Sequence, residues 1–87
     1  MSILKVSIRQ LKAARALLAW SQDELAARSG VSIPTVKRLE AADGALGGRT
    51  HTNNKLLAAL EAAGIEFIDD NGGGIGVRLK KRRGSKP

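Results

Sequence analysis

The stretch SQDELAARSGVSIPTVKRLE, from Ser21 to Glu40, decides how this chain folds. Ser21 stands before a short helical pattern and has Glu24 three residues later, which is the spacing of a capping box. Gly30 follows the end of that pattern, as expected of a left-handed residue that terminates a helix. Ser32 then predicts a second helix start, with Pro34 in the first turn, where a backbone N–H has no helical partner. The stretch therefore predicts two short helices joined by a tight turn.

The apolar residues of this stretch indicate how the two helices pack. The side chains that can meet at the corner are those of Leu25, Ala26, Val31, Val36 and Leu39. With Val36 and Leu39 directed inward, the opposite face of the second helix carries Ile33, Pro34, Lys37 and Arg38. This arrangement is that of a helix-turn-helix.

The flanking sequence predicts two further helices and a hairpin. Ser7 and Gln10 form another capping-box pattern, followed by apolar residues at helical spacing, so we expect a helix over residues 8–19. Residues 41–54, AADGALGGRTHTNN, predict a loop, after which Thr52 or Asn53 caps the helix KLLAALEAA, which stops at Gly64. Residues 65–80, where IEFI and IGVRL flank DDNGGG, predict a hairpin. The N-terminal run ILKVS is either a short strand or a frayed arm.

The length and the charge bound the class of protein. A chain of 87 residues has room for one small core. The net charge is +7, and residues 78–87 alone carry six basic and no acidic side chains. Such a balance favours a polyanionic partner, most often nucleic acid, although a solubilising surface with an unstructured tail is the alternative. We expect one domain over residues 1–80 and a basic disordered tail over residues 81–87.

Several functions are excluded by composition. Without cysteine and with one histidine, His51, the chain offers no disulfide framework and no multi-histidine metal site, and we expect no cofactor. No catalytic cluster exists, since Asp69 and Asp70 fall in a turn, so we expect no enzyme. The run DNGGGIG lacks the following helix of a phosphate-binding loop and reads as a turn. No apolar run is long enough to span a membrane, and the N-terminus lacks a signal peptide, so we expect a cytoplasmic, nucleoid-associated protein.

Nine positions of the opening stretch resemble the XRE-type, or phage-repressor-like, helix-turn-helix regulators. They fit the motif S-Q-x-x-L-A-x-x-x-G-V-S-x-x-T-[IV]-x-x-[LI]-E and are Gln22, Leu25, Ala26, Gly30, Val31, Ser32, Val36, Leu39 and Glu40. The resemblance extends from about Leu11 to Leu60, with the helix-turn-helix at residues 21–41. Two departures are Ser29, where the family commonly has an apolar residue, and the loop after Glu40. The implied fold is mostly α: a four-to-five-helix, phage-repressor-like DNA-binding domain with a C-terminal β-hairpin.

The resemblance implies that the second helix enters the major groove of double-stranded DNA. Side chains at its N-terminal end then reach base edges. Arg38 is the strongest candidate, because its guanidinium matches guanine O6 and N7, and Lys37 is next. Ile33 and Pro34 can only make apolar contacts, for example with a thymine methyl group. The remaining predicted DNA contacts, to phosphate or base, are Gln22, Ser32, Thr35, Arg49, Thr50 and Asn53.

Each of these residues also has a purely structural interpretation. Lys37 and Arg38 could form a solvated helix face, and Ser32 is an N-cap in any case. Gln22 could be a first-turn surface residue, while Arg49, Thr50 and Asn53 could be loop and cap residues. Trp20 is expected to pack at the end of the first helix, and His51 is expected in solvent. The tail is expected to add affinity for DNA without specificity.

A single helix-turn-helix contacts few base pairs, so we expect a homodimer. The two copies are expected to meet either through the hairpin, whose strand edges are unpaired, or through Leu57 and Leu60 of the fourth helix. The operator is then an inverted repeat with half-sites about 34 Å apart. The predicted function is a transcriptional regulator that acts as a repressor. The alternative is an antitoxin-like interaction module that binds its own promoter and a partner protein.

Overall fold

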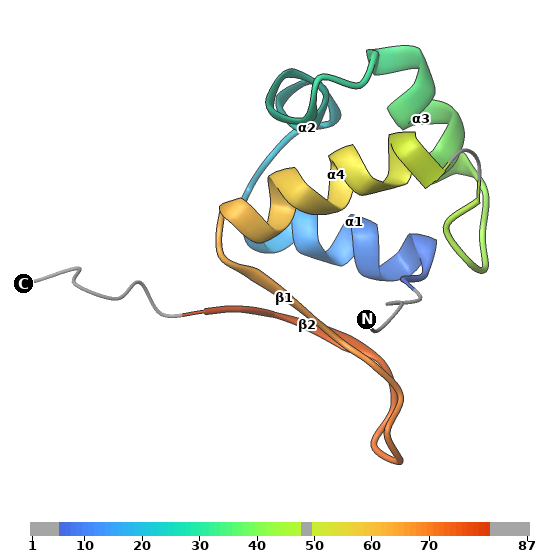
Figure 1. The fold of residues 1–87 in the computed structure, drawn as a ribbon, viewed down its shortest axis with the longest axis vertical. Helices are drawn as coiled ribbons and strands as arrows, with labels where there is room; N and C mark the ends of the chain where they lie inside the picture. Colours follow the sequence, from blue (N-terminus) through green and yellow to red (C-terminus); the bar gives the residue numbers. More distant parts are fainter. Residues whose placement is uncertain (1–5, 48–49, 81–87) are drawn as a thin grey trace, which may run out of the picture.

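The computed structural model describes residues 6–47 and 50–80, which form four helices and a two-stranded antiparallel sheet (Figure 1). The elements are α1 (Ile8–Leu17), α2 (Gln22–Ser29), α3 (Ile33–Ala41), α4 (Thr50–Ala62), β1 (Ile65–Ile68) and β2 (Gly76–Leu79). The expected fold class, mostly α with a C-terminal hairpin, is confirmed. Within the described ranges, none of the helices is both long and apolar enough to cross a membrane.

The start of α1 confirms the predicted capping box. The Gln10 amide N–H donates to Ser7 Oγ at 3.0 Å, and the Ser7 N–H donates to Gln10 Oε1 at 2.9 Å. The helix ends at Leu17, two residues before the predicted end, because Ala19 adopts a left-handed backbone with φ 58°. The Trp20 N–H donates to the Arg15 carbonyl and the Ala19 N–H to the Ala16 carbonyl, so α1 ends in a Schellman motif with alanine at the left-handed position.

The caps of α2 and α3 also lie where the sequence places them. Ser21 Oγ accepts from the Glu24 N–H at 3.0 Å, and Ser32 Oγ accepts from the Thr35 N–H at 3.3 Å. Gly30 ends α2 with φ 77°. In a capping box the Glu24 carboxylate would accept from the Ser21 N–H. Here it accepts from Arg28 Nε at 2.6 Å instead.

The predicted start of α4 was wrong. The helix begins at Thr50, so Thr52 and Asn53 lie inside its first turns rather than at its cap. Asn53 Nδ2 donates instead to the Leu46 carbonyl at 3.4 Å, which ties the preceding loop to the helix. The predicted end at Gly64 agrees with the left-handed φ of 107° there.

The hairpin over residues 65–80 is confirmed, with strands of four residues. Ile65 pairs with Leu79 and Ile68 with Gly76. In the connecting turn, Asp70 Oδ1 accepts from the N–H groups of Gly72 and Gly74, both at 3.2 Å. Of the run ILKVS only Val6 and Ser7 are described, and Ser7 forms an isolated antiparallel bridge with Ala45.

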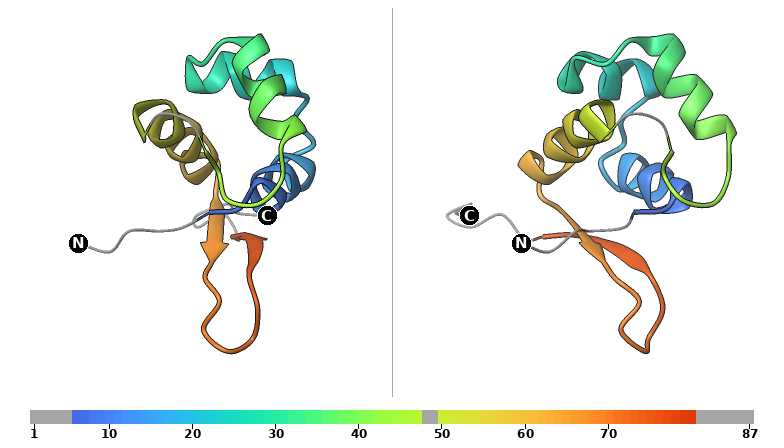
Figure 2. Two further views of the ribbon diagram at one scale, coloured as in Figure 1. Left: turned by 90° about the vertical axis from the view of Figure 1, so that its right-hand side faces the viewer. Right: turned by 45° about the vertical axis from the view of Figure 1, so that its right-hand side comes forward.

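One core joins all these elements. Helix α2 packs on α3 and α4, α3 packs on α1, and the hairpin places β2 against α1 and β1 against α4. Figures 1 and 2 show the hairpin on the side of α1 away from α2 and α3, with its tip extending beyond the helices. The largest fully buried side chains are those of Ile8, Leu11, Leu25, Val36, Leu56, Leu60 and Ile65. Because Leu60 is buried within the monomer, it cannot supply the dimer contact that was predicted for it.

A buried glutamine fixes the hairpin to α1. Gln10 is 3% exposed, and its Nε2 donates to the carbonyls of Ile68 at 3.1 Å and Gly76 at 2.9 Å. These two residues face each other at the end of the strand ladder. Both amide hydrogens and the amide oxygen of Gln10 are therefore satisfied, as a buried polar group requires.

Candidate nucleic-acid interface

The corner between α2 and α3 directs one face of α3 into solvent. The five predicted corner residues are all buried: Leu25, Ala26, Val31, Val36 and Leu39. The opposite face of α3 carries the side chains that were predicted to meet DNA, and all four are exposed: Ile33, Pro34, Lys37 and Arg38. The apolar packing thus fixes which side chains a partner of this helix would meet.

The two cations of this face are available to a ligand. Within residues 6–47 and 50–80, neither Lys37 nor Arg38 makes an ion pair or a side-chain hydrogen bond, whereas Arg9, Arg28 and Arg78 pair with carboxylates. A charge that is not neutralised by its neighbours contributes its full field to the attraction of a polyanion. The exposed face of α3 is therefore positive as well as accessible.

Two hydroxyl groups lie at the start of α3, and only one can donate outward. Ser32 Oγ accepts from the Thr35 N–H and donates its proton to Thr35 Oγ1 at 2.9 Å. The proton of Thr35 Oγ1 is then the one left for an external acceptor, because each hydroxyl carries a single donor. Ser32 is a cap, and Thr35 is the better candidate for a DNA contact.

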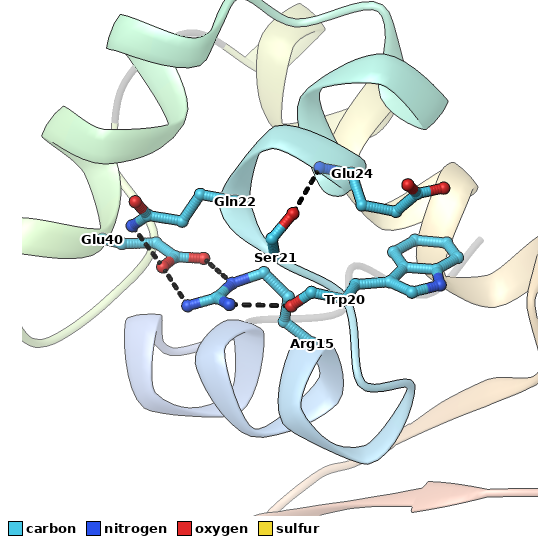
Figure 3. A network of polar contacts seen from close by, with 6 residues as sticks. All are labelled: Arg15, Trp20, Ser21, Gln22, Glu24 and Glu40. Atoms are coloured by element: carbon cyan, nitrogen blue, oxygen red, sulfur yellow. Dashed lines mark hydrogen bonds and ion pairs between the residues drawn. The ribbon is translucent and has the colours of Figure 1, made fainter.

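A network of polar side chains joins α1, α2 and α3 behind this face (Figure 3). Arg15 donates from Nε and Nη2 to the two carboxylate oxygens of Glu40, at 2.9 and 2.8 Å. Its Nη1 donates to the Trp20 carbonyl at 2.9 Å. Gln22 Nε2 donates to Glu40 Oε1, also at 2.9 Å. The first residue of α2 is thereby held against the last turn of α3.

The network keeps Glu40 charged although it is 4% exposed. Burial by itself favours the protonated form, but the hydrogen bonds from Arg15 and Gln22 outweigh it and hold the pKa of Glu40 below its usual 4.5. The hydrogen bond to Glu40 likewise raises the pKa of Arg15. The sequence matched Glu40 to the family motif, but no local signal shows that Arg15, 25 positions away, is its partner.

The remaining predicted contacts occupy different environments. Gln22 is half-buried, and the second hydrogen of its amide is not used by Glu40. Thr50 is exposed at the first position of α4. The Asn53 amide is turned toward the loop, and its Oδ1 is buried with no partner among the described residues. Arg49 lies outside the described residues.

Two other residues behave as the sequence suggests. Trp20 is half-buried against the core, and the Arg28 guanidinium lies 4.8 Å from the centre of its ring. His51 is exposed. Over the described ranges, no three His, Asp or Glu side chains gather as metal ligands would.

Comparison with protein families agrees with this geometry. Residues 11–50 match the family model described as helix-turn-helix, which covers α1 from Leu11 onward, α2, α3 and the chain up to the first residue of α4. Over these residues the chain is similar to that family, and the resemblance to XRE-type regulators is confirmed. The match supports a DNA-binding transcriptional regulator of the XRE kind, and the matched family is a regulatory rather than an enzymatic one. No curated protein matches the chain.

Proposed function

We propose that this regulator is a repressor that binds an inverted-repeat operator as a homodimer and acts by occupying a promoter. The observation that carries the proposal is the exposed face of α3, where neither Lys37 nor Arg38 forms an ion pair with the described residues. A helix held by a buried corner and presenting cations on its outer face suits insertion into the major groove.

We assign the contacts according to the donors that the structure leaves available. Arg38 contacts guanine O6 and N7, because its planar guanidinium carries two parallel donors. Lys37 contacts a base or a phosphate, and Ile33 and Pro34 make apolar contacts with thymine methyl groups. Phosphates are bound by the amide of Gln22 and the hydroxyl groups of Thr35 and Thr50. Asn53 is left out, since its amide holds the loop before α4.

The hairpin is the better of the two candidate dimer surfaces. In the fourth helix Leu60 is fully buried and Leu57 is half-buried, so neither of the two leucines is fully exposed to a partner. The hairpin instead exposes Ile75 and Leu79, at 52% and 43%. A two-stranded ribbon also has unpaired edges, and association with a second copy would remove them from solvent.

Selection of bound sequences from random duplex DNA, at about 150 mM salt to suppress non-specific binding, tests this proposal. We expect a palindromic consensus whose half-sites are separated by about one helical turn. Sedimentation of the protein with a selected duplex should give two chains per site. A consensus without symmetry would contradict the homodimer, and a lack of enrichment would contradict operator binding.

A further inference from the structure

The turn of the hairpin carries two neighbouring residues that can react with each other. Asn71 precedes Gly72 between β1 and β2, in the run DDNGGG. Figures 1 and 2 show this turn at the tip of the hairpin, beyond the helices. Asn71 is exposed, and within the described ranges the side-chain hydrogen bonds of the turn are made by Asp70 rather than by Asn71. The Asn71 carboxamide is therefore open to water, and no hydrogen bond to a described residue holds it in place.

Gly72 gives the Asn71 side chain access to the next peptide nitrogen. Its backbone has φ 107°, and a Cβ built on it would meet no atom within 4 Å beyond its own chain neighbours. Because glycine has no Cβ, no side chain obstructs the approach of Asn71 Cγ to the Gly72 nitrogen. A ring that joins these two atoms thus finds no other part of the chain in its way on that side.

From the exposure of Asn71 and the open surroundings of Gly72, we infer that this pair is a site of spontaneous deamidation. The Gly72 nitrogen loses its proton to a base in the solvent and bonds to Asn71 Cγ. The bond from Cγ to Nδ2 breaks, and that NH2 group takes up a proton and leaves as ammonia. Water then opens the cyclic imide. Cleavage between the nitrogen and Cγ leaves aspartate at position 71, and cleavage at the main-chain carbonyl leaves isoaspartate.

Asp70 should slow this reaction. The peptide nitrogen attacks only after it loses its proton, because its lone pair is otherwise shared with the carbonyl group. Asp70 Oδ1 accepts that proton's hydrogen bond from the Gly72 N–H at 3.2 Å. The carboxylate also opposes a second negative charge on the nitrogen beside it. The hydrogen bond is long and exposed, so it delays the reaction rather than prevents it.

Deamidation would change the tip of the hairpin and leave α3 as it is. Position 71 gains a negative charge beside Asp69 and Asp70. Isoaspartate also adds a methylene group to the main chain, so Asp70 Oδ1 cannot keep its bonds to the N–H groups of Gly72 and Gly74 in the same geometry. The hairpin lies on the side of α1 away from α2 and α3 (Figures 1 and 2). The inference therefore does not depend on the proposed operator or dimer.

Asn54 provides an internal comparison. It is exposed like Asn71, but it lies in α4 and is followed by Lys55. The N–H of Lys55 belongs to the hydrogen-bond ladder of the helix, and its side chain obstructs the nitrogen. Ring closure at Asn54 thus requires local opening of the helix, whereas ring closure at Asn71 does not.

Incubation of the full chain at physiological temperature and mildly alkaline pH, followed by trypsin digestion and mass spectrometry, tests this inference. Cleavage after Lys55 and Arg78 yields the peptide 56–78, in which Asn71 is the only side-chain amide, whereas Asn54 falls in the peptide 50–55. We expect conversion of amide to acid at least about tenfold faster at Asn71 than at Asn54. In guanidinium chloride the rate at Asn54 should rise by a larger factor than the rate at Asn71, since unfolding removes the helix. Electron-transfer fragmentation of the peptide identifies isoaspartate.

Two variants test the assigned roles. Asn71→Gln should abolish the conversion in the peptide 56–78, because the longer side chain would have to close a larger ring. Asp70→Ala should accelerate conversion at Asn71 by about two- to tenfold, as for the loss of one hydrogen bond. Far-UV circular dichroism should be unchanged in both. Equal rates at Asn71 and Asn54 in the folded chain, or conversion that persists in Asn71→Gln, would overturn the inference, and slower conversion in Asp70→Ala would overturn the role of Asp70.

Discussion

Arg15 and Glu40 connect α1 to the last turn of α3 through two parallel hydrogen bonds of 2.9 and 2.8 Å. Glu40 is almost completely buried, and its side chain also accepts from Gln22 at the start of α2. The pair therefore fixes the relative positions of three helices, two of which form the helix-turn-helix. Such a pair is costly to break, because the remaining partner is left without its counter-charge.

Replacement of Glu40 by glutamine should lower the free energy of unfolding by about 2 kcal/mol, less than for a fully buried pair because Arg15 keeps some contact with water. Urea denaturation measures the change. The matched control is Glu66→Gln, since the Glu66–Arg78 pair is exposed and should contribute less than about 1 kcal/mol. Equal losses of unfolding free energy in the two variants would show that the buried Arg15–Glu40 pair stabilises the fold no more than the exposed Glu66–Arg78 pair.

The same pair should make the stability depend on pH. The pKa of Glu40 is lower in the folded chain than its usual 4.5, so the unfolded chain binds more protons in this range. The stabilisation that Glu40 contributes is complete above pH 4.5 and is lost as the pH falls through the pKa of Glu40 in the folded chain. In urea denaturation between about pH 7 and about pH 3, the stability difference between wild type and Glu40→Gln should shrink toward the acid end. A difference that stays constant with pH would contradict this assignment.

Gln10 should control the attachment of the hairpin. Its amide donates to the Ile68 and Gly76 carbonyls, so Gln10→Leu leaves both without these bonds and should cost about 1–3 kcal/mol. Hydrogen exchange should accelerate at amides of β1 and β2 more than at amides of α2 and α3. Gln22→Leu is the control, because Gln22 lies at the start of α2 and its amide donates to Glu40 of α3 rather than to the hairpin. Uniform acceleration in both variants would mean that Gln10 supports the whole core rather than the hairpin.

The features that sequence predicted are those set by nearby residues. Ser32 caps α3 because its hydroxyl reaches an N–H three residues later, and Gly30 ends α2 because only a few residue types adopt its backbone. Both effects act within one turn, so they can be recognised without knowing the fold. The outward face of α3 followed from helical periodicity, since the buried residues of the corner determine the opposite face.

The features that sequence missed depend on residues far apart in the chain. Gln10 was recognised only as half of a capping box, because its partners Ile68 and Gly76 lie 58 and 66 residues away. The early start of α4 at Thr50 was missed because threonine and asparagine are poor helix formers. In the folded chain the Asn53 side chain holds the preceding loop, a tertiary contact that local propensity does not contain.

Ala19 should be a site where one substitution stabilises the protein. It is the left-handed residue of the Schellman motif that ends α1, with φ 58°. A left-handed non-glycine residue costs about 1–2 kcal/mol, and glycine avoids this at the expense of some chain entropy. Ala19→Gly should therefore raise the free energy of unfolding by about 0.5–1 kcal/mol, as measured by urea denaturation. Ala13→Gly, at an exposed position inside α1, should lower it by about 1 kcal/mol. Destabilisation by both changes would contradict the strain at Ala19.

Arg38 should determine base preference, and the basic tail should not. Arg38→Ala removes the proposed guanine contact, so it should cost about 1–3 kcal/mol on the preferred duplex and relax the preference at one base position. Removal of residues 81–87 should instead weaken binding to all duplexes alike and reduce its dependence on salt, because phosphate contacts carry no sequence information. Arg9→Ala is the control, since Arg9 is exposed on α1 and already pairs with Asp43. Competition binding with single-base variants of the selected duplex, repeated at several salt concentrations, separates these effects. If Arg38→Ala and the truncation changed affinity in the same way, α3 would be a general phosphate contact rather than the source of specificity.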